Sequence, residues 1–189
     1  MNPVYAVLLV ISEEKRGRLE GRTLLQKKLY FLSVLMRKDF QFRPHYYGPY
    51  SENVADAVNT LVSAGFLKEH AAASSIPNVF GERRRYSYTI TAGGKELLEF
   101  ISNNEVDDFE KWQERLRRLN SLSISSNWNL LSIAAKMHYI LSEDKQLSAN
   151  NIRNKAEELG WQITVDEINK VAEDLIYLGL IKEVTAPKN

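Results

Sequence analysis

Three consecutive arginines, Arg83 to Arg85, are the residues whose type and spacing point most directly to chemistry. Successive side chains on a strand alternate between its two faces, so at least one of the three guanidinium groups points away from the other two. Guanidinium groups pair well with phosphate and carboxylate groups. The triplet leaves three interpretations open: a solvated hairpin edge, a contact to nucleic acid, or a contact to a protein or acidic ligand.

Other basic residues could extend the same surface. Within residues 14 to 43 the chain carries nine basic and three acidic residues, and the basic ones include Lys27, Lys28, Arg37, Lys38 and Arg43. The net charge of the whole chain is only +1, however. This local excess is a modest electrostatic footprint for a nucleic-acid partner, weaker than that of a strongly basic DNA-binding protein.

The sequence offers little for catalysis or metal binding. It contains no cysteine, which excludes a thiol nucleophile, a zinc finger and a disulfide framework. The three histidines, His45, His70 and His138, lack the spacing of metal ligands. No glycine-rich phosphate loop or nucleophile elbow occurs, and Gly93-Gly94 is better explained as a helix entry. We therefore expect no enzymatic activity, no cofactor and no metal.

An aromatic cluster surrounds the dipeptide Gly48-Pro49, which must break any helix there. Its members are His45, Tyr46, Tyr47 and Tyr50. A rigid turn with several aromatic rings could line a groove for a ligand or peptide. The same cluster could instead fill the core beneath a tight turn, which is the commoner arrangement.

The composition is that of a folded protein without a membrane segment. The longest apolar run near the N-terminus, Val4 to Ile11, is about half as long as a membrane-spanning helix, and no basic leader precedes it. Together with the lack of cysteine, this predicts a cytoplasmic protein.

Helix signals organise the first half of the chain. Asn2-Pro3 opens a helix expected at about 3 to 15, and Thr23 to Gln26 has the form of a capping box for a second helix at about 24 to 38. Alternating residues at 40 to 43 predict a short strand. Ser51 is a good N-cap for a third helix at about 52 to 64, which Gly65 ends.

A β-hairpin and a fourth helix follow the third helix. Residues 66 and 67 start a strand, a polar stretch forms the turn, and residues 83 to 91 return as a strand rich in aromatic and β-branched side chains. Thr91 then opens another helix. Three helices, a hairpin and a helix in this order predict a winged helix-turn-helix domain over residues 1 to 103.

This hairpin region resembles the wing of the MarR- and PadR-type regulators. In those proteins a helix ends in glycine, a strand and a basic wing follow, and an aromatic-containing strand closes on Thr-x-x-Gly. The residues at these positions here are Gly65, Arg83 to Arg85, Tyr86, Tyr88, Thr91 and Gly94.

A second resemblance rests on GRTLLQKKLYFL followed by HYYGPYS. This pair of segments is similar to a family of poorly characterised prokaryotic YwgA-like proteins and, more distantly, to the Panacea or SocA-like antitoxin domain. The resemblance implies a helical fold related to the winged helix. It transfers no catalytic residues.

The second half begins with an amphipathic helix at about 105 to 119, whose apolar residues are Val106, Phe109, Trp112, Leu116 and Leu119. This stripe could pack within the chain, or it could form the seam of a homodimer through residues 106 to 119. Residues 120 to 127, rich in serine and asparagine, are the best linker candidate. Residues 104 to 126 are thus expected to connect two domains.

A helical, winged-helix-like domain is predicted for residues 127 to 189. Ser148 caps one of its helices and Thr164 to Glu167 forms a capping box for another. The segment from Leu175 to Glu183 corresponds to the segment from Leu61 to Glu69, each with an apolar helix, a glycine and a short strand ending in Lys-Glu. This is either a weak internal repeat or chance similarity, because junctions of this kind are common.

The sequence therefore predicts a mainly α protein with a short β-hairpin, and two functions remain in competition. The leading hypothesis is a DNA-binding transcriptional regulator that uses a winged helix on double-stranded DNA. Its expected contacts are Arg83, Arg84, Arg85, Lys27, Lys28, Ser51, Asn53 and Asn59. The alternative is a protein-interaction module, an antitoxin or adaptor, because Glu52 and Asp56 on the third helix would oppose phosphate groups.

Overall fold

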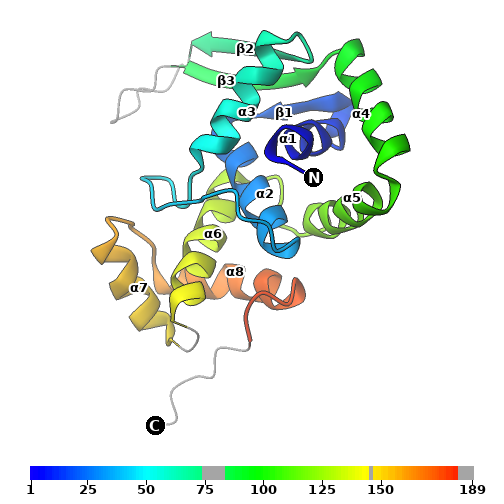
Figure 1. Ribbon diagram of the computed structural model, residues 1–189. Helices are drawn as coiled ribbons and strands as arrows, with labels where there is room; N and C mark the ends of the chain where they lie inside the picture. Colours follow the sequence, from blue (N-terminus) through cyan, green and yellow to red (C-terminus); the bar gives the residue numbers. More distant parts are fainter. Residues whose placement is uncertain (74–83, 145–146, 183–189) are drawn as a thin grey trace.

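The computed structural model describes residues 1–73, 84–144 and 147–182, and over these ranges the chain is mainly helical with a small antiparallel sheet (Figure 1). The elements of the first half are α1 (Pro3–Ser12), a 3-10 turn (Lys15–Gly17), β1 (Arg18–Glu20), α2 (Arg22–Leu35), α3 (Glu52–Ser63), β2 (Leu67–Ala73), β3 (Arg84–Ile90) and α4 (Ala92–Asn104). Those of the second half are α5 (Val106–Asn120), α6 (Trp128–Glu143), α7 (Ala149–Glu158) and α8 (Val165–Tyr177).

Two helices, α1 and α2, form the centre of the first half. All residues from Ala6 to Ile11 in α1 are fully buried, and all residues from Leu24 to Ser33 in α2 are buried. A helix that is apolar on every side needs neighbours on every side. Helices α3 and α4 and the sheet cover α1, while α5 and α6 cover α2.

The sheet has the strand order β1-β3-β2, with both pairs antiparallel. The predicted hairpin is confirmed, since Leu67 pairs with Ile90 and Ala73 with Arg84. Strand β1 was not predicted. It adds Leu19 to the core opposite Tyr88, so the hairpin is joined to the segment that connects α1 to α2.

Several expected boundaries of the first half are corrected. Helix α1 ends at Ser12, because Glu14 already has an extended backbone with ψ of 155°, and Arg16 and Gly17 beyond it are left-handed with φ of 61° and 63°. The capping box at Thr23 to Gln26 is wrong, since α2 begins two residues earlier than expected, at Arg22, after Gly21. Residues 40 to 43 form no strand; only Arg43 makes an isolated bridge, to Tyr50.

The second half packs on the first through α6, which contacts α2 on one side and α7 and α8 on the other (Figure 1). Packing of the α5 stripe within the chain is confirmed for Phe109, Trp112, Leu116 and Leu119, which are buried, but not for Val106, which is 47% exposed. A homodimer through residues 106–119 would therefore have to use the outward side of α5. The linker candidate is packed as well, with Leu122 and Ile124 in the core.

The two helix ends compared in the sequence have the same geometry, which fits both an internal repeat and chance similarity. Gly65 and Gly179 have nearly equal left-handed φ angles of 76° and 72°. The next amide in each copy bonds back to the helix, Phe66 to the Leu61 carbonyl at 2.9 Å and Leu180 to the Leu175 carbonyl at 3.0 Å. The strand expected after Gly179 is absent from residues 180–182, and Glu183 lies outside the described residues.

In the part of the chain that the structure describes, no helix is long and apolar enough to cross a bilayer.

Candidate nucleic-acid interface

Helix α3 presents one polar face to solvent and one apolar face to the core. Its buried side chains are Val54, Ala57, Val58 and Leu61, whereas Asn53, Asp56 and Asn59 are exposed. Glu52 and Thr60 are exposed on the same helix. The predicted DNA contacts Asn53 and Asn59 are thus accessible. The carboxylates of Glu52 and Asp56, which would repel phosphate groups, are accessible as well.

Ser51 has a structural position instead of a surface one. It is fully buried, and its hydroxyl accepts a hydrogen bond from the Val54 amide at 3.2 Å and donates one to the Phe40 carbonyl. The N-cap prediction is therefore confirmed. The prediction that Ser51 contacts DNA is wrong for this structure, because its side chain is buried.

The hairpin exposes Arg85 on its outer face. Residues paired across the two strands share a face, and the face alternates along each strand. Because Lys68 pairs with Thr89, His70 with Ser87 and Ala72 with Arg85, the exposed Arg85 lies on the same face as Lys68 and His70. Arg84 begins β3 opposite Ala73, and Arg83 lies outside the described residues.

Arg22 supports the opposite face of the hairpin. Its guanidinium carbon lies 3.4 Å from the centre of the Tyr86 ring, and its Nε donates to the Tyr88 hydroxyl at 3.0 Å. A terminal nitrogen reaches the Glu69 carboxylate at 3.4 Å. The first residue of α2 therefore fixes how the hairpin leaves the body of the protein. Sequence analysis missed this residue, since nothing local to Arg22 reveals its distant partners.

Lys27 and Lys28, both predicted to contact phosphate, lie inside the protein at 1% and 2% exposure, and this prediction is wrong for the structure. The Lys27 ammonium donates to the Pro49 carbonyl at 2.7 Å. Lys28 forms an ion pair with Glu14 and a hydrogen bond of 2.9 Å to the Asn120 side chain. Both lysines lie within the segment of α2 from Leu24 to Ser33, in which every residue is buried.

The long connection between α2 and α3, residues 36–51, is fixed by hydrogen bonds to α2, to Trp161 and within the loop itself. Gln26 donates to the Ser51 carbonyl and accepts from the Ser51 amide, both at 3.0 Å. Arg43 and Tyr50 exchange backbone hydrogen bonds of 2.9 Å, which closes the loop on itself. The Trp161 indole donates to the His45 carbonyl at 2.6 Å. The two segments that resemble the YwgA-like family thus form one unit.

This connection carries exposed cations. Arg37, Lys38 and Arg43 are exposed, and Asp39 is the acidic residue among them. In Figure 1 the connection lies on the same side of the molecule as the N-terminal end of α3 and the C-terminal end of β2. The cations of this connection are therefore accessible to a partner, whereas Lys27 and Lys28 are not.

The aromatic cluster reaches the surface rather than filling the core. His45 is exposed, Tyr46 is 47% exposed, and Tyr47 and Tyr50 are partly buried. Tyr46 and Tyr47 meet edge to face with ring centres 4.9 Å apart, and Tyr47 also meets Trp128 of α6 at 6.2 Å. The His45 and Tyr50 rings lie 5.0 Å apart. The cluster lies on the loop that leads into α3 and is partly open to solvent.

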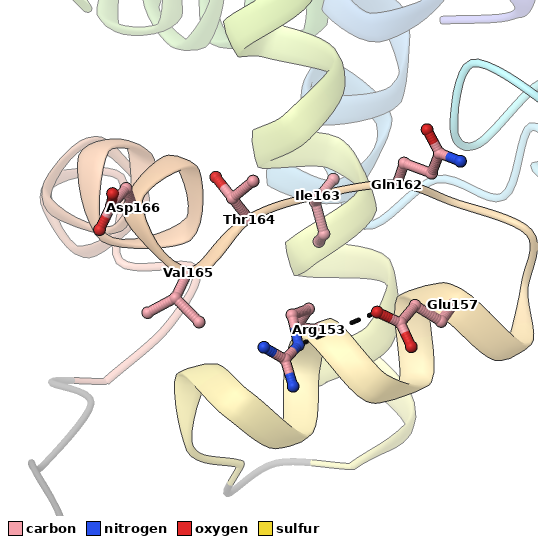
Figure 2. A pocket seen from close by; sticks show the side chains of 7 residues that line it. All are labelled: Arg153, Glu157, Gln162, Ile163, Thr164, Val165 and Asp166. Carbon is pink, nitrogen blue, oxygen red and sulfur yellow. Dashed lines mark ion pairs between the residues drawn. The ribbon is translucent and has the colours of Figure 1, made fainter.

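A separate open pocket of about 400 Å³ lies in the second half (Figure 2). The pocket is lined on one side by Arg153 and Glu157 of α7. The other lining residues are Gln162 to Thr164, between α7 and α8, and Val165 and Asp166 at the start of α8. Arg153 and Glu157 are 3.9 Å apart and form an ion pair. The charge of Arg153 is therefore balanced by Glu157 on the same helix. Across the described ranges, no three metal-ligating side chains gather.

No model of a known protein family matches the chain. Over 96 residues it is 28% identical to the uncharacterized protein YwgA of Bacillus subtilis (strain 168), in an alignment that covers 50% of this chain and 54% of that protein. The predicted similarity to YwgA-like proteins is therefore confirmed as a distant one. The chain spans about half the length of this relative, whose name assigns it no activity.

Proposed function

We propose that the protein binds double-stranded DNA as a winged helix-turn-helix regulator, with α3 as the reading helix and the β2–β3 hairpin as the wing. The observation that carries the proposal is the order of elements, α1-β1-α2-α3-β2-β3, combined with the strand order β1-β3-β2. In such domains the second helix of the helix-turn-helix lies in the major groove. Here that helix, α3, keeps its polar face open to solvent.

The charges support a contact mainly to the phosphate backbone. Arg43 of the loop that precedes α3 and Arg85 of the hairpin that follows it are both exposed cations. Phosphate contacts give affinity and position, whereas side chains on the reading helix give specificity. Asn53 and Asn59 suit adenine, and a carboxylate such as that of Glu52 can accept from the amino group of cytosine.

The connection between α2 and α3 departs from the short turn of other helix-turn-helix domains, which is usually three or four residues long. Residues 36–51 fill this position instead. In the proposed complex, this loop lies along the DNA backbone beside α3 and contributes Arg37, Lys38 and Arg43. In this proposal, these three cations make the phosphate contacts that the buried Lys27 and Lys28 do not make.

A salt titration tests the proposal. We expect a random-sequence duplex of about 30 base pairs to bind at about 50 mM salt, with log K falling by about 0.9 per log unit of salt for each phosphate contact. Arg85→Ala and Arg43→Ala should each reduce this slope by about 0.9. Arg117→Ala, at an exposed cation of α5, is the matched control and should leave it unchanged.

Asp56→Asn probes the reading helix with a nearly equal side-chain volume. If α3 enters the groove, removing this exposed carboxylate strengthens binding to random duplex DNA. No binding at about 50 mM salt, or binding that does not respond to salt, contradicts the proposal.

The second candidate is a protein-interaction module of the antitoxin or adaptor kind. The specific observation in its favour is that the exposed residues of α3 include Glu52 and Asp56 but neither lysine nor arginine. Such a face repels phosphate and attracts a basic protein surface. Loss of all DNA affinity in the salt titration, with Asp56→Asn making no difference, favours this candidate.

A further inference from the structure

Lys27 connects the centre of α2 to the loop between α2 and α3. Its side chain is 1% exposed, and its amino group donates to the Pro49 carbonyl at 2.7 Å. An ammonium group has three donors and is costly to bury without a counter-ion. Within the described ranges, no carboxylate forms an ion pair with Lys27.

The turn over this amine is tightly packed. Gly48 has a left-handed φ of 92°, and its amide bonds to the His45 carbonyl at 2.9 Å. A Cβ atom on Gly48 would lie 3.0 Å from Cγ of Lys136 and 3.5 Å from Cε of Lys27. The stems of two lysines therefore lie against one glycine, and a second positive charge is held near the first.

The charged and titratable groups around Lys27 do little to balance a positive charge on its amine. Helix α6 contributes Lys136, His138 and Tyr139, and the turn contributes His45. Glu167 of α8 acts on Lys136, which also lies 5.9 Å from the Trp161 ring. Burial, with a smaller contribution from the Lys136 charge, lowers the pKa of Lys27 to about 7. The pKa of His138 is lowered by burial to about 4, and that of Tyr30 is raised by burial.

We propose that Lys27 is a proton-operated latch for the loop of residues 36–51: the uncharged amine holds the Gly48-Pro49 turn against α2 and α6, and protonation releases it. The turn is followed directly by Ser51, the N-cap of α3, so release loosens the start of that helix. This device is independent of whether α3 binds DNA or protein.

The direction of the pH effect follows from linkage. The closed loop lowers the pKa of Lys27 to about 7, whereas an opened loop returns it toward the ordinary value of 10.5. The open state therefore binds more protons than the closed state between these two pH values. The opening constant of the loop rises about tenfold for each pH unit as the pH falls from about 10 to about 7, and levels off below that.

Native-state hydrogen exchange of the full chain, at pH 6 to 9, tests the latch. The reporters are the amides of Arg43, Gly48 and Tyr50, which are bonded within the loop, and the reference is the amide of Trp112 in α5. After correction for intrinsic exchange, we expect loop protection to increase with pH about tenfold per unit above pH 7. Global unfolding also exposes Lys27, so protection of Trp112 should follow the same slope from a higher level, because the loop opens at a lower free energy than the whole chain unfolds.

Three variants separate the latch from other causes. Lys27→Met should make loop protection independent of pH, and His45→Gln should leave the wild-type slope intact. Lys136→Met, which removes the facing charge, should move the levelling point above pH 7 while keeping the slope. Loop protection that is independent of pH in the wild type, or the same slope in Lys27→Met, overturns the proposal. Equal protection of the loop amides and of Trp112 at every pH also overturns it, since opening would then be global.

Discussion

Gln26 and Ser51 exchange two hydrogen bonds of 3.0 Å although they are 25 residues apart in the chain. The Gln26 amide group donates to the Ser51 carbonyl and accepts from the Ser51 amide, so one side chain satisfies both backbone groups of the residue that caps α3. Both residues are buried. The start of α3 is therefore fixed by α2 as well as by its own loop.

Replacing Gln26 by leucine should destabilise the protein by about 1 to 3 kcal/mol. The change leaves the buried amide of Ser51 without a partner, which costs about 1 to 3 kcal/mol, whereas the Ser51 carbonyl still accepts from the Ala55 amide at 3.2 Å. Urea unfolding followed by circular dichroism measures the loss. The exposed Gln162→Leu is the matched control and should stay within about 0.5 kcal/mol of the wild type. Equal stabilities of the two variants would show that the exchange contributes nothing.

Two adjacent glycines at the start of α4 should respond oppositely to alanine. A Cβ on Gly94 would lie 2.3 Å from the Phe66 carbonyl oxygen and 2.8 Å from Cγ1 of Ile90, so Gly94→Ala must push the helix off the hairpin. We expect a loss of about 1 to 3 kcal/mol or more. A Cβ on Gly93 would meet its nearest neighbour, a ring carbon of Phe66, at 3.7 Å.

Gly93→Ala should therefore be neutral or raise stability by up to about 1 kcal/mol, because alanine favours the helix more than glycine does. Thermal unfolding of the pair at one pH is sufficient to compare them. A Gly94→Ala variant as stable as Gly93→Ala would contradict the close contact of α4 with Phe66.

Helix starts were predictable from sequence because a cap is a local interaction. The side chains of Asn2, Ser51, Thr91, Ser148 and Thr164 all accept the hydrogen bonds expected of N-caps. Strand β1 was missed for the opposite reason. Its three residues carry no alternation long enough to read, and they become a strand only because β3 lies beside them in the fold.

The burial of Lys27 was also missed, although a signal was present. Lys27 lies three residues after Leu24 and four before Phe31, which places all three on one face of α2. Lysine is rarely buried without a partner, so its charge outweighed this periodicity in the sequence analysis. Only the fold brings Pro49 close enough to accept its hydrogen bond.

Arg22→Lys should weaken the contact between α2 and the β2–β3 hairpin. Lysine keeps the charge but loses the planar group that lies over the Tyr86 ring, 3.4 Å from its centre, and that bonds to Tyr88 and Glu69. Arg22 is about half exposed, so the loss should be modest, about 1 kcal/mol. Hydrogen exchange at β2 and β3 should increase more than exchange at α5.

Arg18→Lys is the control for that measurement, since Arg18 is an exposed arginine whose ion pair with Glu20 lies within β1. It should leave exchange at β2 and β3 unchanged. If both variants loosen the hairpin equally, stacking on Tyr86 is not what orients it.

Acid should destabilise the protein through His138. The Tyr30 hydroxyl and Nδ1 of His138 are 2.7 Å apart in the interior, where burial lowers the pKa of the imidazole from 6.5 to about 4. The unfolded chain therefore binds a proton on this group at a higher pH than the folded chain does. The stability linked to His138 is complete above about pH 6.5 and is lost as the pH falls to about 4.

This difference in pKa corresponds to about 3 kcal/mol between pH 7 and pH 4. His138→Gln keeps an acceptor for the Tyr30 hydroxyl but cannot be protonated in this range. We therefore expect the free energy of unfolding of this variant, from urea titrations at pH 7, 5.5 and 4, to fall by about 3 kcal/mol less than that of the wild type. Tyr30→Phe retains the buried imidazole and should keep most of the acid sensitivity. If His138→Gln loses as much stability as the wild type over the same interval, acid acts through other groups.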